Sequence, residues 1–117
     1  MTFKIAIKRV YDGADPDDGY RILVDRLWPR GISKDVAAID EWLKELAPSA
    51  DLRKWFDHRS ERFEEFEAKY LVELKSVKSE LDRVRFIAAE KQVTLVYGAR
   101  DLLHNQAVVL RNVLAQE

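Results

Sequence analysis

Apolar and polar residues alternate along parts of the chain in ways that predict strands near both ends. In residues 3–8, apolar side chains alternate with Lys4, Ala6 and Lys8, as in a strand near a sheet edge with one covered face. Residues 20–27 lose this alternation in an apolar run at their centre, which predicts a strand in the sheet interior. The β-branched content of residues 93–97 predicts a second buried strand.

The segment that follows the second strand carries two conflicting patterns. Val36, Ile39, Leu43 and Leu46 recur at helical spacing behind a Ser33 cap, whereas residues 42–46 also alternate as a strand would before Pro48. We expect a short helix over 34–38 and a strand over 41–46. The pattern does not decide whether residues 39–46 form a strand or a helix. Residues 51–56 then predict a short helix.

A long helical stripe occupies the middle of the chain, bordered by Glu, Lys and Arg. Its apolar members follow one another in steps of three or four: Phe63, Phe66, Tyr70, Leu74, Val77, Leu81 and Val84. The stripe is longer than most globular helices and Ser79 with Asp82 resembles a new capping box, so we expect a break near 76–79. A closing helix is predicted by Leu103, Ala107, Leu110 and Leu114.

The connection between the first two strands limits their arrangement. Residues 12–19 are all typical of turns and too few for a crossover helix, so these strands are either antiparallel neighbours or joined by an irregular loop. Residues 1–117 fit one domain with one core. We therefore predict a single α/β domain with a mixed, partly parallel sheet of about four strands flanked by helices.

Composition excludes several classes of function. The chain has 20 basic and 21 acidic residues and a formal charge of -1, so nucleic-acid binding is not supported by net charge and needs a local patch. There is no cysteine and only His58 and His104, so we expect no metal site and no cofactor. No window is apolar for the roughly 18 residues that span a bilayer, and the N-terminal stretch is charged, so we expect no membrane association and a cytoplasmic location.

Charged and aromatic residues follow two of the predicted strands. If these strands run parallel, their carboxyl ends share one rim, where open α/β sheets bind ligands. The residues gathered there are Asp25, Arg26, Trp28, Arg30, Arg100, Asp101, His104 and Asn105. The three arginines offer planar forks for phosphate or carboxylate, and the start of the last helix adds free backbone N–H groups.

Chemical roles follow from the residue types at this rim. His104 is the candidate general acid or base, with Asp25 or Asp101 to orient it. Arg26, Arg30, Arg100, Asp101 and Asn105 are candidate ligand-binding residues, and Trp28 offers a flat surface for a ring.

Structural roles compete with each of these assignments. Asp25 at a buried strand end can simply pair with Arg26 or Arg100. The structural role of Trp28, Trp42 and Trp55 is to supply the large aromatic side chains that a small core buries or is covered by. His104 can be a polar residue at a helix start, and His58 a loop residue before a helix or a ligand. The Gly pattern matches no nucleotide-binding loop.

Four segments resemble the YeaO-like proteins of the domain of unknown function 488 family. They are Tyr20-Arg-Ile-Leu-Val-Asp-Arg-Leu-Trp-Pro-Arg-Gly31, Trp42-Leu-Lys-Glu-Leu-Ala-Pro-Ser49, Leu52-Arg-Lys-Trp-Phe56, and Tyr97-Gly-Ala-Arg-Asp with His104-Asn-Gln-Ala. The resemblance implies a small cytoplasmic α/β protein and a strand over 42–46, but no activity. Larger members carry Cys-His-Arg where this chain has Leu103-His104-Asn105, which leaves only the histidine in place.

Two functions from different classes follow. The first is an enzyme or binding protein for a small anionic, phosphate- or carboxylate-bearing ligand at the strand ends, where Arg26, Arg30 and Arg100 hold the anion and His104 with Asp25 transfers any proton. The alternative is a non-catalytic nucleic-acid- or protein-binding module, in which Arg30, Lys34 and residues 53–55 form a basic aromatic patch.

Overall fold

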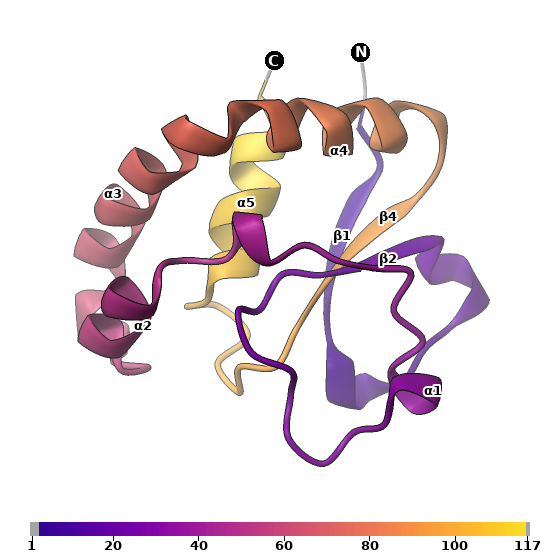
Figure 1. The fold of residues 1–117 in the computed structure, drawn as a ribbon, viewed down its shortest axis with the longest axis horizontal. Coiled ribbons are helices and arrows are strands. Elements are labelled where there is room, and N and C mark those ends of the chain that lie inside the picture. Colours follow the sequence, from indigo (N-terminus) through magenta and orange to yellow (C-terminus); the bar gives the residue numbers. More distant parts are fainter. Residues whose placement is uncertain (1–2, 117) are drawn as a thin grey trace.

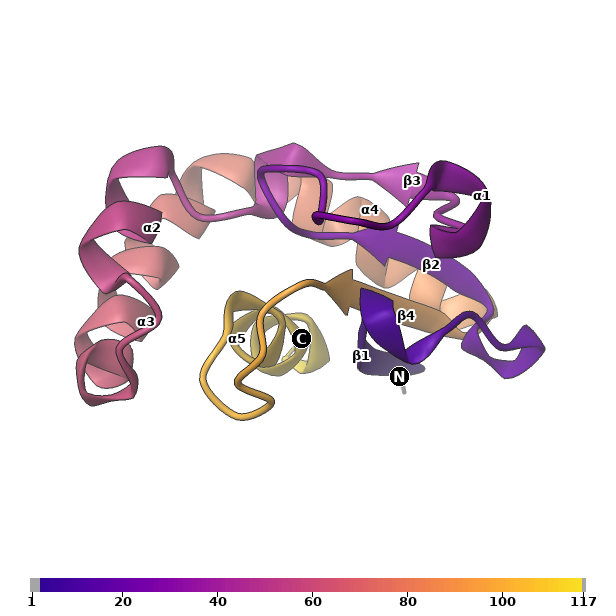
Figure 2. The ribbon, with the colours of Figure 1, turned by 90° about the horizontal axis from the view of Figure 1, so that it is seen from below.

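A four-stranded parallel sheet forms the centre of the molecule. The computed structural model describes residues 3–116, so Met1 and Thr2 of the N-terminal stretch lie outside it. The strands are β1 (Ile5–Arg9), β2 (Tyr20–Leu23), β3 (Glu41–Trp42) and β4 (Val93–Tyr97), in the order β1-β4-β2-β3 (Figure 1 and Figure 2). The α/β class, the edge position of β1 and the interior position of β2 are confirmed.

The expected mixed sheet needs one correction, because all three strand pairings are parallel. β4 lies between β1 and β2 and pairs with both, so the first two strands are not antiparallel neighbours. The alternative of an irregular loop is the one observed: residues 10–19 contain two short 3-10 turns, Val10–Asp12 and Pro16–Asp18.

Five helices complete the described part of the chain. They are α1 (Lys34–Ala37), α2 (Ala50–Phe56), α3 (Phe63–Leu74), α4 (Lys78–Glu90) and α5 (Gln106–Ala115). The predicted break in the long stripe is a 3-10 turn, Lys75–Val77. Figure 2 shows α2 and α3 at one end of the molecule and α1 at the other, with α5 and the sheet between them.

The two faces of the sheet are covered differently, because alternate strand residues point to opposite sides. Ile22, Leu95 and Tyr97 enter the main core, where α2 to α5 pack. Leu23 and Val96 enter a smaller cluster under α1 and two tryptophans. The long helices therefore lie on one face only.

Three predicted boundaries are wrong. The strand expected over 41–46 covers only Glu41–Trp42 and gives way to a 3-10 turn, Lys44–Leu46, because Leu43 and Leu46 are both buried and a spacing of three suits a turn. Leu103 is 72% exposed and precedes α5 instead of packing in it. The strand predicted over 20–27 likewise ends early, at Leu23.

Candidate functional site

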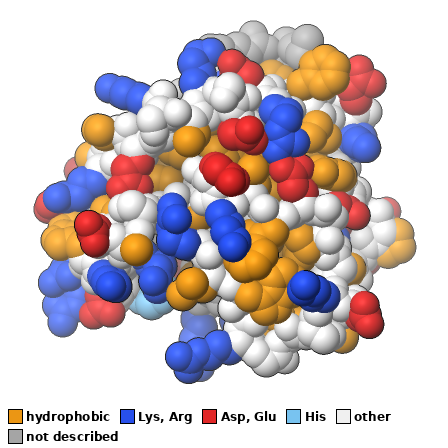
Figure 3. Space-filling view, in the orientation of Figure 1, with side chains coloured by type: hydrophobic (Ala, Val, Ile, Leu, Met, Phe, Trp, Pro, Cys, Tyr) orange, Lys and Arg blue, Asp and Glu red, His pale blue; other side chains and the backbone are white. Residues whose placement is uncertain are grey.

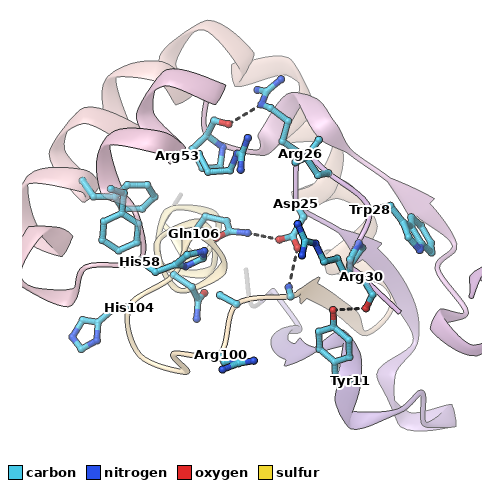
Figure 4. Close-up of a pocket in the computed structure, with 18 residues that line it drawn as sticks. Tyr11, Asp25, Arg26, Trp28, Arg30, Arg53, His58, Arg100, His104 and Gln106 are labelled. Atoms are coloured by element: carbon cyan, nitrogen blue, oxygen red, sulfur yellow. Dashed lines mark hydrogen bonds between the residues drawn. The ribbon is translucent and has the colours of Figure 1, made fainter. Parts of the chain in front are cut away.

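A cavity of about 660 Å³ opens at the carboxyl ends of β2 and β4. Both strands end in loops at this edge because they run parallel and pair directly. The cavity is lined by residues of these loops, of the turn after β1, of α2 and its flanking loops, of α3 and of the start of α5. They are Tyr11, Asp25, Arg26, Leu27, Trp28, Pro29, Arg30, Pro48, Arg53, Phe56, His58, Phe66, Gly98, Ala99, Arg100, His104, Asn105 and Gln106 (Figure 4). Its size is that of a typical small-molecule site.

Asp25 lies where the two strand-end loops meet. Its carboxylate accepts hydrogen bonds from the Gly98 backbone N–H, at 2.9 Å, and from the Gln106 side-chain amide. A Cβ atom at position 98 would lie 2.9 Å from Asp25 Oδ2, so glycine allows this close approach. Asp25 thus joins the β2 loop to both the β4 loop and α5.

Burial determines the proton affinity of this carboxyl group. It raises the pKa of Asp25 to about 6, against the opposing effects of the two hydrogen bonds and of the nearby Arg53 charge. The pairing with Arg26 or Arg100 that the sequence left open does not occur in the described structure. Asp25 is therefore a partly buried carboxyl whose direct hydrogen-bond donors are uncharged.

Further hydrogen bonds hold the loops around the cavity. Arg9 Nε donates to the Ala99 carbonyl at 2.8 Å, and the Tyr11 hydroxyl donates to the Arg30 carbonyl at 2.8 Å. Arg26 Nε donates to the Pro48 carbonyl at 2.8 Å, which ties the β2 loop to the start of α2. The cavity wall is thus fixed by side chains that cross between loops.

Four arginines surround the cavity: Arg26, Arg30, Arg53 and Arg100. Figure 4 shows Arg26 and Arg53 above Asp25 and Arg100 below it. Within residues 3–116, none of the four forms an ion pair with a carboxylate. Figure 3 shows basic side chains gathered on this face around a histidine. The local charge is therefore positive, although the chain as a whole carries -1.

His104 lies apart from Asp25, on the outer side of its loop (Figure 4). Its Nδ1 is 2.9 Å from Asp101 Oδ2, and its ring meets Phe63 edge-on. The Leu103 N–H and the His104 side chain donate to the Asp101 carboxylate and hold its pKa below the ordinary value. Of the two carboxylates that the sequence offered to orient His104, the structure pairs it with Asp101.

Trp28 and Asn105 have structural partners. The Trp28 indole donates to the Ile32 carbonyl at 2.8 Å, and its ring packs edge-on against Trp42, so its structural interpretation as a covering residue is confirmed. Asn105 is the N-cap of α5, where its side chain accepts from the Val108 N–H. Both residues still line the cavity.

The structure does not assemble the basic aromatic patch of the alternative function. Lys34 belongs to α1 and residues 53–55 to α2, at opposite ends of the molecule (Figure 2). Instead, Arg53 joins Arg30 at the cavity. The Trp55 ring packs on the main core and lies near Arg62 and Lys69, 5.4 and 4.9 Å from its centroid.

Arg53, His58, Gln106 and Gly98 are cavity residues that the sequence did not assign to the rim site. His58 was weighed only as a loop residue or a ligand, and the structure confirms that it lies in the loop after α2. No local pattern marks Arg53 and His58, because their position depends on how α2 packs. Gly98 directly follows the strand predicted over 93–97 and Gln106 follows the His104-Asn105 pair, so these two did carry a signal.

No group of three or more His, Cys, Asp or Glu side chains suited to a metal ion occurs within residues 3–116. In the same range, no helix has both the length and the apolar composition needed to cross a membrane.

The fold and the site together define a small parallel α/β domain with a cationic cavity at its strand ends. The chain belongs to the DUF488 family: residues 4–117 match the family model described as the inactive DUF488-N3 subclade. It is 48% identical to the uncharacterized protein YeaO of Escherichia coli over 110 residues, which are 94% of this chain and 96% of the relative. It is 41% identical to the uncharacterized protein Rv3073c of Mycobacterium tuberculosis over 111 residues, 95% and 93% of the two chains. No solved structure matches the chain.

Proposed function

We propose that this protein binds a small anionic metabolite in the cavity at the ends of β2 and β4. The observation that carries this function is the set of four arginines, none of them paired with a carboxylate among the described residues, around a cavity of about 660 Å³. Guanidinium groups bind phosphate and carboxylate through paired hydrogen bonds, so an anion supplies the negatively charged partner that these arginines lack.

Binding without conversion of the ligand is the form of this function that we favour. The catalytic pair expected from the sequence, His104 with Asp25, has no mutual contact, since each is hydrogen-bonded to other residues. The matching family model is itself described as inactive. His104 and Asp25 then serve the site as a wall residue and as the group that joins the loops.

Phosphate is the simplest ligand for a test. We expect inorganic phosphate to raise the thermal unfolding midpoint, because a ligand of the folded state stabilises it. Arg53→Gln removes one guanidinium and one charge-assisted hydrogen bond, so it lowers phosphate affinity about tenfold or more in calorimetric titration.

Lys75→Gln is the matched control for that experiment. Lys75 is exposed in the turn between α3 and α4 and is not among the residues that line the cavity, so its replacement removes the same charge elsewhere. Equal losses of affinity in both variants would show attraction by overall charge and contradict a site in the cavity. Release of phosphate from added phosphate esters by the wild-type protein would contradict binding without conversion.

A further inference from the structure

A second cavity, of about 470 Å³, adjoins the first. It is lined by His58, Gly98, Ala99, Arg100 and Asp101, and the first four of these also line the main cavity. The two spaces therefore meet at His58 and Arg100. A ligand that places its anion beside Arg53 has room to extend past this junction.

The backbone holds His58 at the junction in an uncommon conformation. Asp57 and His58 are consecutive non-glycine residues at φ values of 50° and 54°, in the left-handed region. One such residue is enough to end a helix, and Asp57 does so for α2, with its N–H bonded to the Arg53 carbonyl. The second, His58, directs its ring into the cavity (Figure 4). Strain of this kind is typical of functional residues.

His58 is exposed, and its ring makes no hydrogen bond to another residue within residues 3–116. Its two nitrogens are therefore available to a ligand, one as donor and one as acceptor when the ring is neutral. This distinguishes it from His104, whose Nδ1 is bonded to Asp101.

The chemistry of the second cavity differs from that of the first. Arg100 supplies donors and Asp101 supplies carboxylate oxygens that carry negative charge. A second phosphate group would be repelled by Asp101, whereas hydroxyl groups both donate and accept hydrogen bonds. A set of guanidinium, imidazole and carboxylate groups therefore suits a hydroxylated part of a ligand.

We infer that the ligand is a phosphorylated sugar or polyol, with its phosphate among the arginines of the main cavity and its hydroxyl groups in the second cavity. His58 is the specificity-determining residue, because it contacts the hydroxylated part at the junction. This assignment rests on the anion-binding function proposed above and adds the class of ligand to it.

The experiment compares calorimetric titrations of inorganic phosphate, unphosphorylated ribose, and three esters: glycerol 3-phosphate, ribose 5-phosphate and glucose 6-phosphate. At least one ester is expected to bind about tenfold more tightly than phosphate, from one or two additional hydrogen bonds. Ribose alone is expected not to bind measurably, since it lacks the anion.

His58→Gly is the decisive variant. It should abolish the preference, so that the variant binds the ester and inorganic phosphate with equal affinity. It should also raise the thermal unfolding midpoint, because glycine adopts a positive φ without strain. His58→Asn tolerates the same backbone and keeps hydrogen-bonding groups, so it should restore part of the preference.

Ala38→Gly is the control for the backbone effect. Ala38 also has a φ of 50° but lies at the end of α1, outside both cavities. This variant should raise the midpoint and leave the preference for the ester unchanged.

The outcomes separate the ligand class from the binding function. Phosphate binding that depends on Arg53, with no ester preferred, would overturn the sugar-phosphate assignment and leave anion binding intact. A preference for an ester that survives in His58→Gly would overturn the role of His58. No binding of phosphate or of any ester would overturn both proposals.

Discussion

Asp25 illustrates how burial of one carboxyl group affects both stability and the site. Its two oxygens are bonded to a backbone N–H and a side-chain amide, so no formal positive charge contacts it directly. Ionisation is therefore unfavourable, and its pKa rises from 3.8 to about 6. Below about pH 6, an uncharged Asp25 removes the one carboxylate of the main cavity's lining that would repel a bound anion.

Replacement of the Asp25 carboxyl should change how the free energy of unfolding depends on pH. Asp25 has a higher pKa in the folded than in the unfolded chain, so the native state binds more protons between about pH 4 and pH 6. Its contribution to the free energy of unfolding therefore decreases as pH rises through this range, by up to about 1.4 kcal/mol per pH unit. In Asp25→Asn this decrease should disappear, as measured by urea unfolding at a series of pH values.

The control for Asp25→Asn is the same substitution at an exposed aspartate. Asp12 is exposed, so Asp12→Asn should follow the wild-type pH profile. A constant difference in unfolding free energy between wild type and Asp25→Asn from pH 4 to pH 7 would contradict the burial argument.

Some residues of the site were recognisable in the sequence and others were not. Asp25 and Arg100 come shortly after buried strands, Arg30 lies further along the loop of Asp25, and parallel strands bring their ends together. Arg53 and His58 belong to a helix and loop whose position depends on packing against α3, which no local pattern reveals. Physical proximity across the chain is the information that the sequence pattern lacks.

At the level of elements, the loop between β4 and α5 shows how side chains determine a helix boundary. The spacing of Leu103, Ala107 and Leu110 predicted a helix that includes Leu103. Asp101 instead accepts the Leu103 and His104 N–H groups at 2.9 and 3.0 Å, and Asn105 caps α5. These local hydrogen bonds compete with the helix and delay its start. By contrast, β4 was predicted at its observed bounds, since residues 93–97 offer no competing pattern.

The Asn105 cap is a testable part of this loop. Its side chain also donates to the Asp101 carbonyl at 2.8 Å, and Asn105 is 1% exposed. Asn105→Ala loses both bonds, so the free energy of unfolding should fall by about 1 to 2 kcal/mol. Asn105→Asp keeps the acceptor for the helix and should lose less. Equal stability of Asn105→Ala and wild type in urea unfolding would show that the cap contributes nothing.

At the level of the whole molecule, a large core packs on one face of the sheet and a smaller cluster on the other, and the same strands contribute side chains to both. Trp28 and Trp42 pack on the face with the smaller cluster, and Trp55 packs on the main core. Leu23 and Ile22 are adjacent in β2 and enter opposite clusters. If the elements packed on one face unfold, the strands that also support the cluster on the other face become exposed to solvent.

We expect one cooperative unfolding transition as a result. Tryptophan fluorescence and far-UV circular dichroism should give coincident urea curves. In Trp55→Phe the fluorescence reports Trp28 and Trp42 alone, and its midpoint should still match that of circular dichroism. An earlier fluorescence midpoint in this variant would mean that the face under α1 unfolds separately.

The position of β4 between β1 and β2 also affects how the chain folds as it is synthesised. Until residues 93–97 leave the ribosome, β1 has no neighbouring strand, and β2 pairs only with the two residues of β3. When four-fifths of the chain has been synthesised, the sheet is therefore still incomplete, because the five residues of β4 have not yet emerged. Folding is consequently a late event in synthesis, dominated by contacts between distant parts of the sequence.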